Sequence, residues 1–180
     1  NLTTRSESYK AVATAGMDLC GTGKKEYVAN LALNASGNTL YLYVTDSNNK
    51  VIGNNQKITF EHVAQLSGME VHQVKGAFSV AAGDFDGDGK DSIIMYEVGA
   101  GNSQIPSLRE CTVTKSGSGY DIEKGTVVVG ETAELPYGLF SLLGDASDMT
   151  KTEAKNAAKV QMEAADTDKD GYDELVVTVS

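Results

Sequence analysis

The chain has 180 residues, of which 41% are hydrophobic and 22% charged, so it has the composition of a folded protein and not of a disordered one. It carries 25 acidic against 15 basic residues, which argues against a protein that binds the phosphate backbone of nucleic acids. No apolar run approaches the roughly 20 residues of a membrane-spanning helix, and 19 glycines against 2 prolines favour short strands joined by tight turns.

Three stretches follow one plan: a strand of small residues, an acidic glycine-rich loop, and an apolar strand. The loops begin at Asp18, Asp84 and Asp166. Such self-similarity indicates a repeat architecture. After the first loop, β-branched and aromatic residues predict strands at 27–33, 39–45, 51–52 and 57–60, with a polar turn at 46–49.

The second stretch repeats this arrangement, with strands predicted at 93–98, 108–115 and 120–129 and a Ser-Gly turn at 116–119. The third stretch stops at Ser180, after its second strand. Helical signal is confined to 148–157, with Asp148 as a possible N-cap, and to 61–66. Both segments lie between the repeats, so we interpret them as connectors.

Each complete unit therefore has about four strands joined by hairpins, as in a propeller blade. We expect an all-β chain, a partial β-propeller of four-stranded antiparallel blades, with units at about 8–70, 71–145 and 157–180, the last incomplete. Because a propeller needs roughly four blades to close, we expect further blades from a longer chain or from another chain.

The second acidic loop has aspartates at alternate positions. Asp84, Asp86 and Asp88 fill the first, third and fifth positions of this loop. Alternate carboxylates in a tight turn can converge on one hard cation, and the glycine that follows them allows the bend. The backbone carbonyl of Lys90 at the seventh position and Ser92 at the ninth complete the candidate set, although a hydroxyl is a weaker donor than a carboxylate.

The third loop follows the pattern more completely. Its candidate donors are Asp166, Asp168, Asp170, the carbonyl of Tyr172 and Glu174. All donors in both loops are oxygens, which suits Ca²⁺ and disfavours zinc or copper.

The first loop departs from this pattern, because Cys20 and Thr22 stand at its third and fifth positions. Only Asp18 and Glu26 remain as carboxylates, so we expect no tight calcium site there. Cys20 and Cys111 are the two cysteines, and the sequence leaves open whether they pair.

An EF-hand is the obvious alternative for the second and third loops. It requires an acid at the twelfth position and a helix on each side. The twelfth residues are Met95 and Val177, and the segments that contain them are apolar and β-branched. The EF-hand interpretation therefore fails in both loops.

The segment 83–93, which runs Gly-Asp-Phe-Asp-Gly-Asp-Gly-Lys-Asp-Ser-Ile, resembles the FG-GAP (VCBS-type) repeat of integrin-like β-propellers and many bacterial surface proteins. In that repeat the loop lies between the first two strands of a blade and binds calcium, mostly as a structural ion. The resemblance is strong for the second loop, good for the third and weak for the first, and with the hairpins it covers most of the chain. It implies that the calcium ligands are Asp84, Asp86, Asp88, Lys90, Asp166, Asp168, Asp170, Tyr172 and Glu174. Ser92 departs from the acid of the family pattern.

Two functions are compatible with these features. The first is a non-catalytic binding or adhesion module of a secreted or cell-surface protein, because neither His62 nor His72 lies in a catalytic constellation. Its ligand would be a protein or a glycan. The alternative is an accessory or catalytic domain of a polysaccharide-acting protein, by analogy with propellers of this kind. Exposed tyrosines beside carboxylates in one cleft would favour the alternative.

Overall fold

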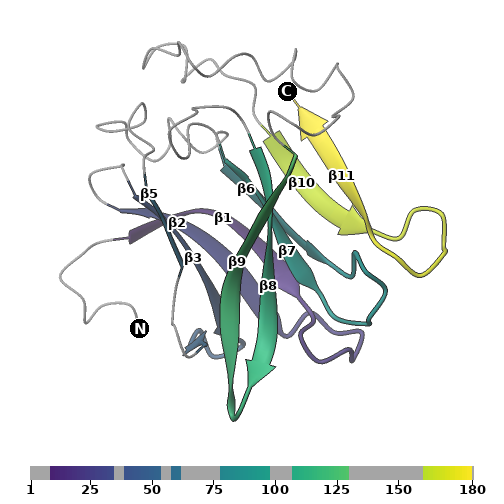
Figure 1. The fold of residues 1–180 in the computed structure, drawn as a ribbon, viewed down its shortest axis with the longest axis horizontal. Helices are drawn as coiled ribbons and strands as arrows, with labels where there is room; N and C mark the ends of the chain where they lie inside the picture. The colour runs from purple at the N-terminus through teal and green to yellow at the C-terminus, as the bar shows by residue number, and fades with distance from the viewer. Residues whose placement is uncertain are drawn as a thin grey trace.

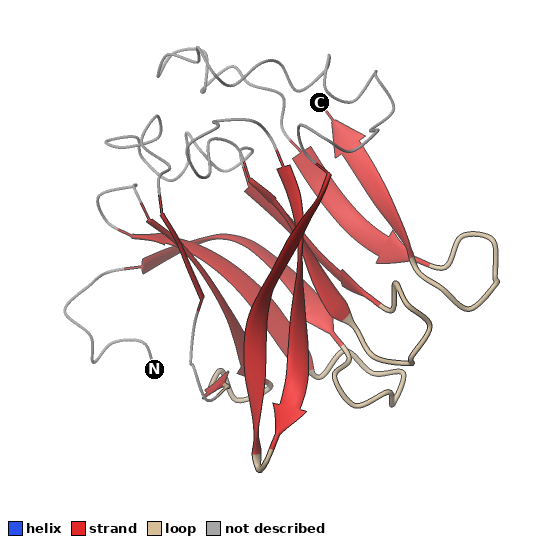
Figure 2. Ribbon diagram, viewed as in Figure 1, coloured by secondary structure: helices blue, strands red, loops and turns tan. Residues whose placement is uncertain are grey.

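The computed structural model describes residues 9–34, 39–53, 58–61, 78–97, 107–129 and 160–179. Within these ranges every helix or strand is a β-strand (Figure 2). The described part contains no helix that is long and apolar enough to cross a membrane. The predicted helical segment at 148–157 lies outside the described residues, as do residues 62–66. Glu61, the first residue of the other predicted helical segment, is the last residue of a strand.

The first sheet is antiparallel and begins with β1 (Tyr9–Met17), β2 (Tyr27–Asn34) and β3 (Thr39–Asp46). Two short strands, β4 (Val51–Ile52) and β5 (Ile58–Glu61), then pair with β3. β4 pairs with residues 44–45 and β5 with residues 39–42, so together they form a broken fourth strand. These strands agree with those predicted from the sequence.

The second sheet has the strand order β6-β7-β8-β9 and is antiparallel throughout. Its strands are β6 (Phe78–Gly83), β7 (Ser92–Glu97), β8 (Ser107–Ser116) and β9 (Gly119–Val129). The turn between β8 and β9 has Gly117 at φ 58°, a left-handed conformation that glycine adopts readily. The third unit is a two-stranded sheet of β10 (Val160–Ala165) and β11 (Glu174–Val179).

The first strands of the three units lie next to one another, with β6 between β1 and β10 (Figure 1). All six residues of β6 are buried for this reason, whereas buried and more exposed residues alternate along most of β10. Gly83 allows a close approach of β6 to β10, because a Cβ atom there would lie only 2.4 Å from the Cβ of Ala164. The core between the units is apolar and includes Met17, Leu31, Leu42, Phe78, Ile93 and Met95.

The prediction of an all-β fold of antiparallel sheets is therefore confirmed. The described strands form three open sheets. The two cysteines are not joined by a disulfide: Cys20 is exposed and Cys111 is buried.

Candidate metal centres

The three acidic loops occupy equivalent places in the three units. Loop 1 (residues 18–26) joins β1 to β2, loop 2 (84–91) joins β6 to β7, and loop 3 (166–173) joins β10 to β11. Positions are counted from the first aspartate of each loop, so the ninth positions after Asp84 and Asp166 are Ser92 and Glu174, the first residues of β7 and β11. All three therefore lie between the first and second strands of a unit, as the sequence predicted, and they gather at one end of the molecule (Figure 2).

The first aspartate of each loop closes the turn with a side-chain to main-chain hydrogen bond. The N–H of the residue at the sixth position, a glycine in every loop, donates to that carboxylate. The three bonds are Gly23 to Asp18 Oδ2 (2.6 Å), Gly89 to Asp84 Oδ2 (2.9 Å) and Gly171 to Asp166 Oδ2 (3.2 Å). This shared bond closes each loop between its first and sixth positions.

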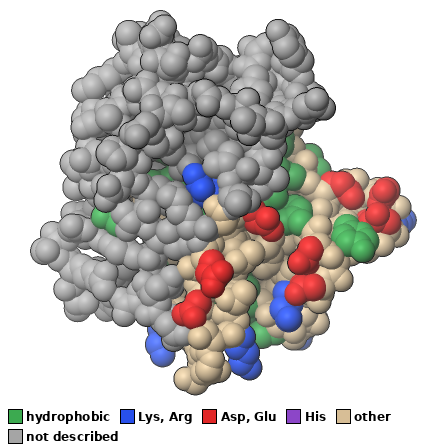
Figure 3. All heavy atoms as spheres, in the orientation of Figure 1, with side chains coloured by type: hydrophobic (Ala, Val, Ile, Leu, Met, Phe, Trp, Pro, Cys, Tyr) green, Lys and Arg blue, Asp and Glu red, His purple; other side chains and the backbone are tan. Residues whose placement is uncertain are grey.

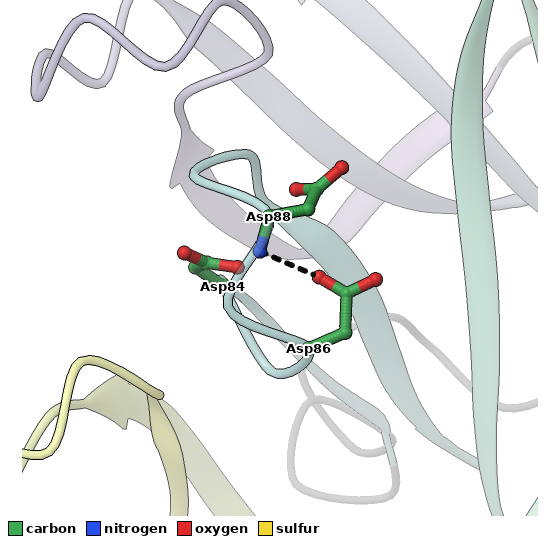
Figure 4. A group of neighbouring side chains, drawn as sticks. All are labelled: Asp84, Asp86 and Asp88. Carbon is green, nitrogen blue, oxygen red and sulfur yellow. Dashed lines mark hydrogen bonds between the residues drawn. The ribbon is translucent and has the colours of Figure 1, made fainter.

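Loop 2 brings its three predicted carboxylates together. Oxygens of Asp84, Asp86 and Asp88 all lie within 4.8 Å of one another. Figure 4 shows these side chains, with the N–H of Asp88 donating to Asp86 Oδ1 at 3.2 Å. Asp88 in turn accepts the N–H of Lys90 at 2.8 Å. Each carboxylate keeps further lone pairs after these bonds, so the group could hold a metal ion.

The Asp84 carboxylate provides a test of fit for a cation. Its Oδ2 accepts the N–H of Gly89, whereas its Oδ1 is buried and has no hydrogen-bond partner. A buried carboxylate oxygen without a partner costs on the order of 1–3 kcal/mol. A cation bound by the three aspartates would supply that partner, so the residues present fit a metal site.

The two remaining predicted donors of loop 2 lie differently. The Lys90 ammonium is 3.7 Å from Asp88 Oδ2, so its side chain lies beside the acidic group while its carbonyl remains the candidate donor. The hydroxyl of Ser92 donates to Glu110 Oε1 of β8 at 3.3 Å. The ninth position of loop 2 is thus engaged with the neighbouring strand.

Loop 3 forms a second acidic group, made of Asp166, Asp168 and Glu174, with oxygens within 4.8 Å of one another. Asp170, also predicted as a ligand, accepts the N–H of Tyr172 at 2.9 Å through Oδ1. Glu174 Oε2 accepts two hydrogen bonds from Thr167, one from its hydroxyl at 2.5 Å and one from its N–H at 2.7 Å. These two hydrogen bonds lower the pKa of Glu174, and the bond from the hydroxyl has the larger effect.

Loop 1 satisfies its carboxylate from its own backbone. Asp18 is buried and accepts the N–H groups of Cys20 at 2.9 Å and Gly23 at 2.6 Å. Burial alone would raise the pKa of Asp18, but hydrogen bonds from four backbone N–H groups outweigh it and lower the pKa. Glu26 is exposed and belongs to neither acidic group of the described residues.

Two further aspartates, Asp91 and Asp173, stand at the eighth positions of loops 2 and 3. Asp91 is buried and contacts loop 1, whereas Asp173 contacts loop 2. The sequence alone leaves Asp91 either as a substitute donor for Ser92 or as a solvent-facing side chain, and it predicts no role for Asp173. The available signal was that an aspartate stands at the eighth position in both loops that keep the acidic pattern.

A hollow of about 460 Å³ lies between loops 1 and 2 and the hairpin of β8 and β9. Its lining includes Cys20, Asp86, Asp88, Lys90, Lys115 and Tyr120. At its edge the Cys20 Sγ lies 3.8 Å from the hydroxyls of both Tyr27 and Tyr120. The hydrogen bond with Cys20, followed by burial and the bond with Tyr120, raises the pKa of Tyr27.

Acidic side chains gather on the described surface where Figure 1 places the loop between β10 and β11 (Figure 3).

Comparison with known proteins found no matching family model, no matching curated protein and no matching solved structure. The candidate sites therefore rest on the geometry of the chain itself.

Proposed function

We propose that the chain is a calcium-stabilised, non-catalytic binding or adhesion module of a secreted or cell-surface protein, built from propeller-type units. One observation carries this proposal. A group of three carboxylates recurs in the same loop of two units, at residues 84–88 and around residues 166–174. Recurrence at one place in a repeat favours a site over a chance cluster of surface acids.

Calcium is the cation that this donor chemistry favours. Both groups offer carboxylate oxygens on loops where backbone carbonyls can contribute as well, and Ca²⁺ accepts six to eight such oxygens in flexible geometry. No histidine or cysteine belongs to either group, and the softer divalent metals prefer those ligands. Extracellular calcium sites of this kind fill at modest affinity, which supports a secreted or cell-surface location.

The ion would stabilise the loops and perform no chemistry. Loop 2 supplies all three carboxylates of the first group, and loop 3 supplies two of the second; the remaining one, Glu174, begins the strand that follows loop 3. Like charges held within 4.8 Å repel one another, and a bound cation removes that repulsion. Calcium would thus fix the end of the molecule where the loops gather.

The arrangement of the units supports the propeller-type interpretation. The first strand of each unit packs on the first strand of the next, so β6 has a neighbour on both sides. The described residues form two sheets that each have the equivalent of four strands, and a two-stranded third sheet. Further units, from a longer chain or from another chain, would extend the same series.

A calcium count combined with thermal unfolding tests the proposal. We expect the chelator-stripped chain to take up two ions and its melting temperature to rise with calcium. Asp86→Asn with Asp88→Asn should remove one ion, and Asp168→Asn with Glu174→Gln the other. Asp46→Asn is the matched control, because its carboxylate accepts the N–H groups of Asn48 and Lys50 in a turn outside both groups. No bound calcium and an unchanged melting temperature would refute the proposal.

A glycan-contacting module of a polysaccharide-acting protein is the second candidate. The hollow beside loop 2 favours it, because Tyr120 and the carboxylates of Asp86 and Asp88 line it together. An aromatic face with nearby polar groups is a common way to hold a sugar ring. A glycan array with wild type and Tyr120→Ala tests this candidate, and binding that is absent or insensitive to the substitution speaks against it.

A further inference from the structure

Neighbouring loops are joined by the same pair of hydrogen bonds at both junctions. Between loops 2 and 3, the N–H of Asp84 donates to Asp173 Oδ2 at 2.9 Å, and the N–H of Asp173 donates to the carbonyl of Asp84 at 2.8 Å. Between loops 1 and 2, Asp18 and Asp91 make the equivalent bonds at 2.6 and 2.8 Å. We call this pair of bonds the eight-to-one clasp, after the loop positions it connects.

The clasp between loops 2 and 3 joins a residue of one acidic group to the chain neighbour of a residue of the other. Asp84 is the first carboxylate of the loop 2 group, and the clasp holds both polar groups of its backbone. Asp173 lies in the chain directly before Glu174, which belongs to the loop 3 group. Asp173 thus adjoins a residue of one candidate site in the chain, while its side chain accepts a hydrogen bond from the first residue of the other.

A second contact joins the same two loops. The ring of Tyr172 lies on Gly87, the residue between Asp86 and Asp88 in the sequence. A Cβ atom at Gly87 would come within 2.6 Å of a ring carbon. Residues 172 and 173 of loop 3 therefore contact loop 2 both at its first residue and at its centre. A shift of these two residues would move the loop 2 backbone at both points.

The junction between loops 1 and 2 differs in one respect. Asp91 Oδ2 also accepts a hydrogen bond from the Lys25 ammonium at 2.6 Å, so a positively charged side chain lies beside that clasp. Loop 1 contributes no residue to an acidic group of the described part. Any coupling between metal sites is therefore confined to loops 2 and 3.

We propose that Asp173 is a positioning residue that couples the two metal sites, so that each ion raises the affinity of the other loop. This inference rests on the proposed function, since both loops must bind a cation. Binding in loop 3 would order residues 172–174, and the clasp would then hold Asp84 in place before loop 2 binds. A preorganised site loses less freedom on binding, and the coupling is reciprocal because it is a single free energy shared by both sites.

Calorimetric titration of Ca²⁺ into the chelator-stripped full chain measures the coupling. Two variants isolate the sites: Asp168→Asn with Glu174→Gln leaves loop 2, and Asp86→Asn with Asp88→Asn leaves loop 3. The coupling factor is the product of the two association constants of wild type divided by the product of the single-site constants. We expect a factor of about 10, within the usual range for linked sites.

Substitutions at Asp173 then assign the coupling to the clasp. Asp173→Ala, measured with intact loops and with either loop inactivated, should bring the factor close to 1. Asp173→Asn retains an acceptor for the Asp84 N–H, so it should keep most of the coupling although it removes the charge. Ser79→Ala is the matched control, because it breaks the other described hydrogen bond between these units, from the Met162 N–H at 3.0 Å, away from the loops. It should leave the factor unchanged.

The outcomes separate this inference from the proposed function. If wild type binds two ions with a coupling factor near 1, the inference is wrong and the proposed function stands. It is also wrong if Ser79→Ala lowers the factor as much as Asp173→Ala does, because the effect would then belong to the whole unit boundary. If wild type binds no calcium, both proposals fail.

Discussion

The Lys25 ammonium lies 2.6 Å from Asp91 Oδ2, and the same oxygen accepts the N–H of Asp18. Lys25 occupies the eighth position of loop 1, where loops 2 and 3 have the aspartate of the clasp. Its Cβ also packs 3.3 Å from the position that a Cβ of Gly16 would take. The eighth residue of loop 1 is therefore directed at the second unit and stabilises a clasp that it does not itself form.

This relationship predicts unequal effects of substituting its two members. Asp91→Ala leaves the Asp18 N–H without its acceptor, and we expect a loss of about 2–3 kcal/mol in the free energy of unfolding. Lys25→Met should lose no more than about 1 kcal/mol, because the Lys25 side chain is half exposed and water screens its charge. Urea unfolding measures both values, and equal losses would contradict the assignment.

The lowered pKa of Asp18 predicts a pH-dependent contribution to stability. A carboxyl group whose pKa is lowered by folding stabilises the protein above its ordinary pKa, about 3.9, and this contribution disappears as the pH falls through the folded-state value. Asp18→Asn should therefore be clearly less stable than wild type at pH 6, and the difference should shrink towards pH 3. A difference that is constant between these pH values, measured by urea unfolding, would show that the charge of Asp18 is not responsible.

The strands and the loop positions could be predicted because they depend on local patterns. Runs of β-branched and aromatic residues marked the strands from 27 to 60 and from 93 to 129, and the spacing of the aspartates marked loops 2 and 3. Both signals act within a few residues of the chain. The sequence could not predict which carboxylates converge, because that depends on the direction of each side chain. In loop 3, Glu174 joins the acidic group, whereas Asp170 accepts a hydrogen bond from the Tyr172 N–H.

The contacts between units could not be predicted from the sequence. The clasps join residues that are 73 and 89 positions apart, and no local pattern shows which acids of a loop point outward to a neighbouring loop. The burial of β6 on both sides likewise depends on the packing of β1 and β10. The direction of the Ser92 hydroxyl towards Glu110 is a further long-range result, because it depends on the pairing of β7 with β8.

A carboxylate at the ninth position of loop 2 should strengthen calcium binding there. Glu174 stands at this position in loop 3 and belongs to its acidic group, whereas loop 2 has Ser92. Ser92→Asp would place a fourth acid near the group and also near Glu110 Oε1, which now lies 3.3 Å from the Ser92 hydroxyl. Without calcium, repulsion between the added carboxylate and its acidic neighbours should lower the melting temperature of the variant below that of wild type. Adding calcium should then raise the melting temperature of the variant by more than it raises that of wild type. Thermal unfolding with calcium and with a chelator measures both, and Ser92→Thr is the neutral control.

Gly87 and Gly89 of loop 2 provide a matched pair for the contact between loops 2 and 3. Both have left-handed φ values, 75° and 85°, so alanine strains the backbone at either position by about 1 kcal/mol. A Cβ atom at Gly87 would come within 2.6 Å of the Tyr172 ring, whereas one at Gly89 would meet nothing within 4 Å. Gly87→Ala should therefore destabilise the chain by up to about 1 kcal/mol more than Gly89→Ala, because the half-exposed Tyr172 ring must move. Tyr172→Ala should remove this difference, and if the two glycine variants unfold at the same urea concentration the Tyr172 contact does not form in solution.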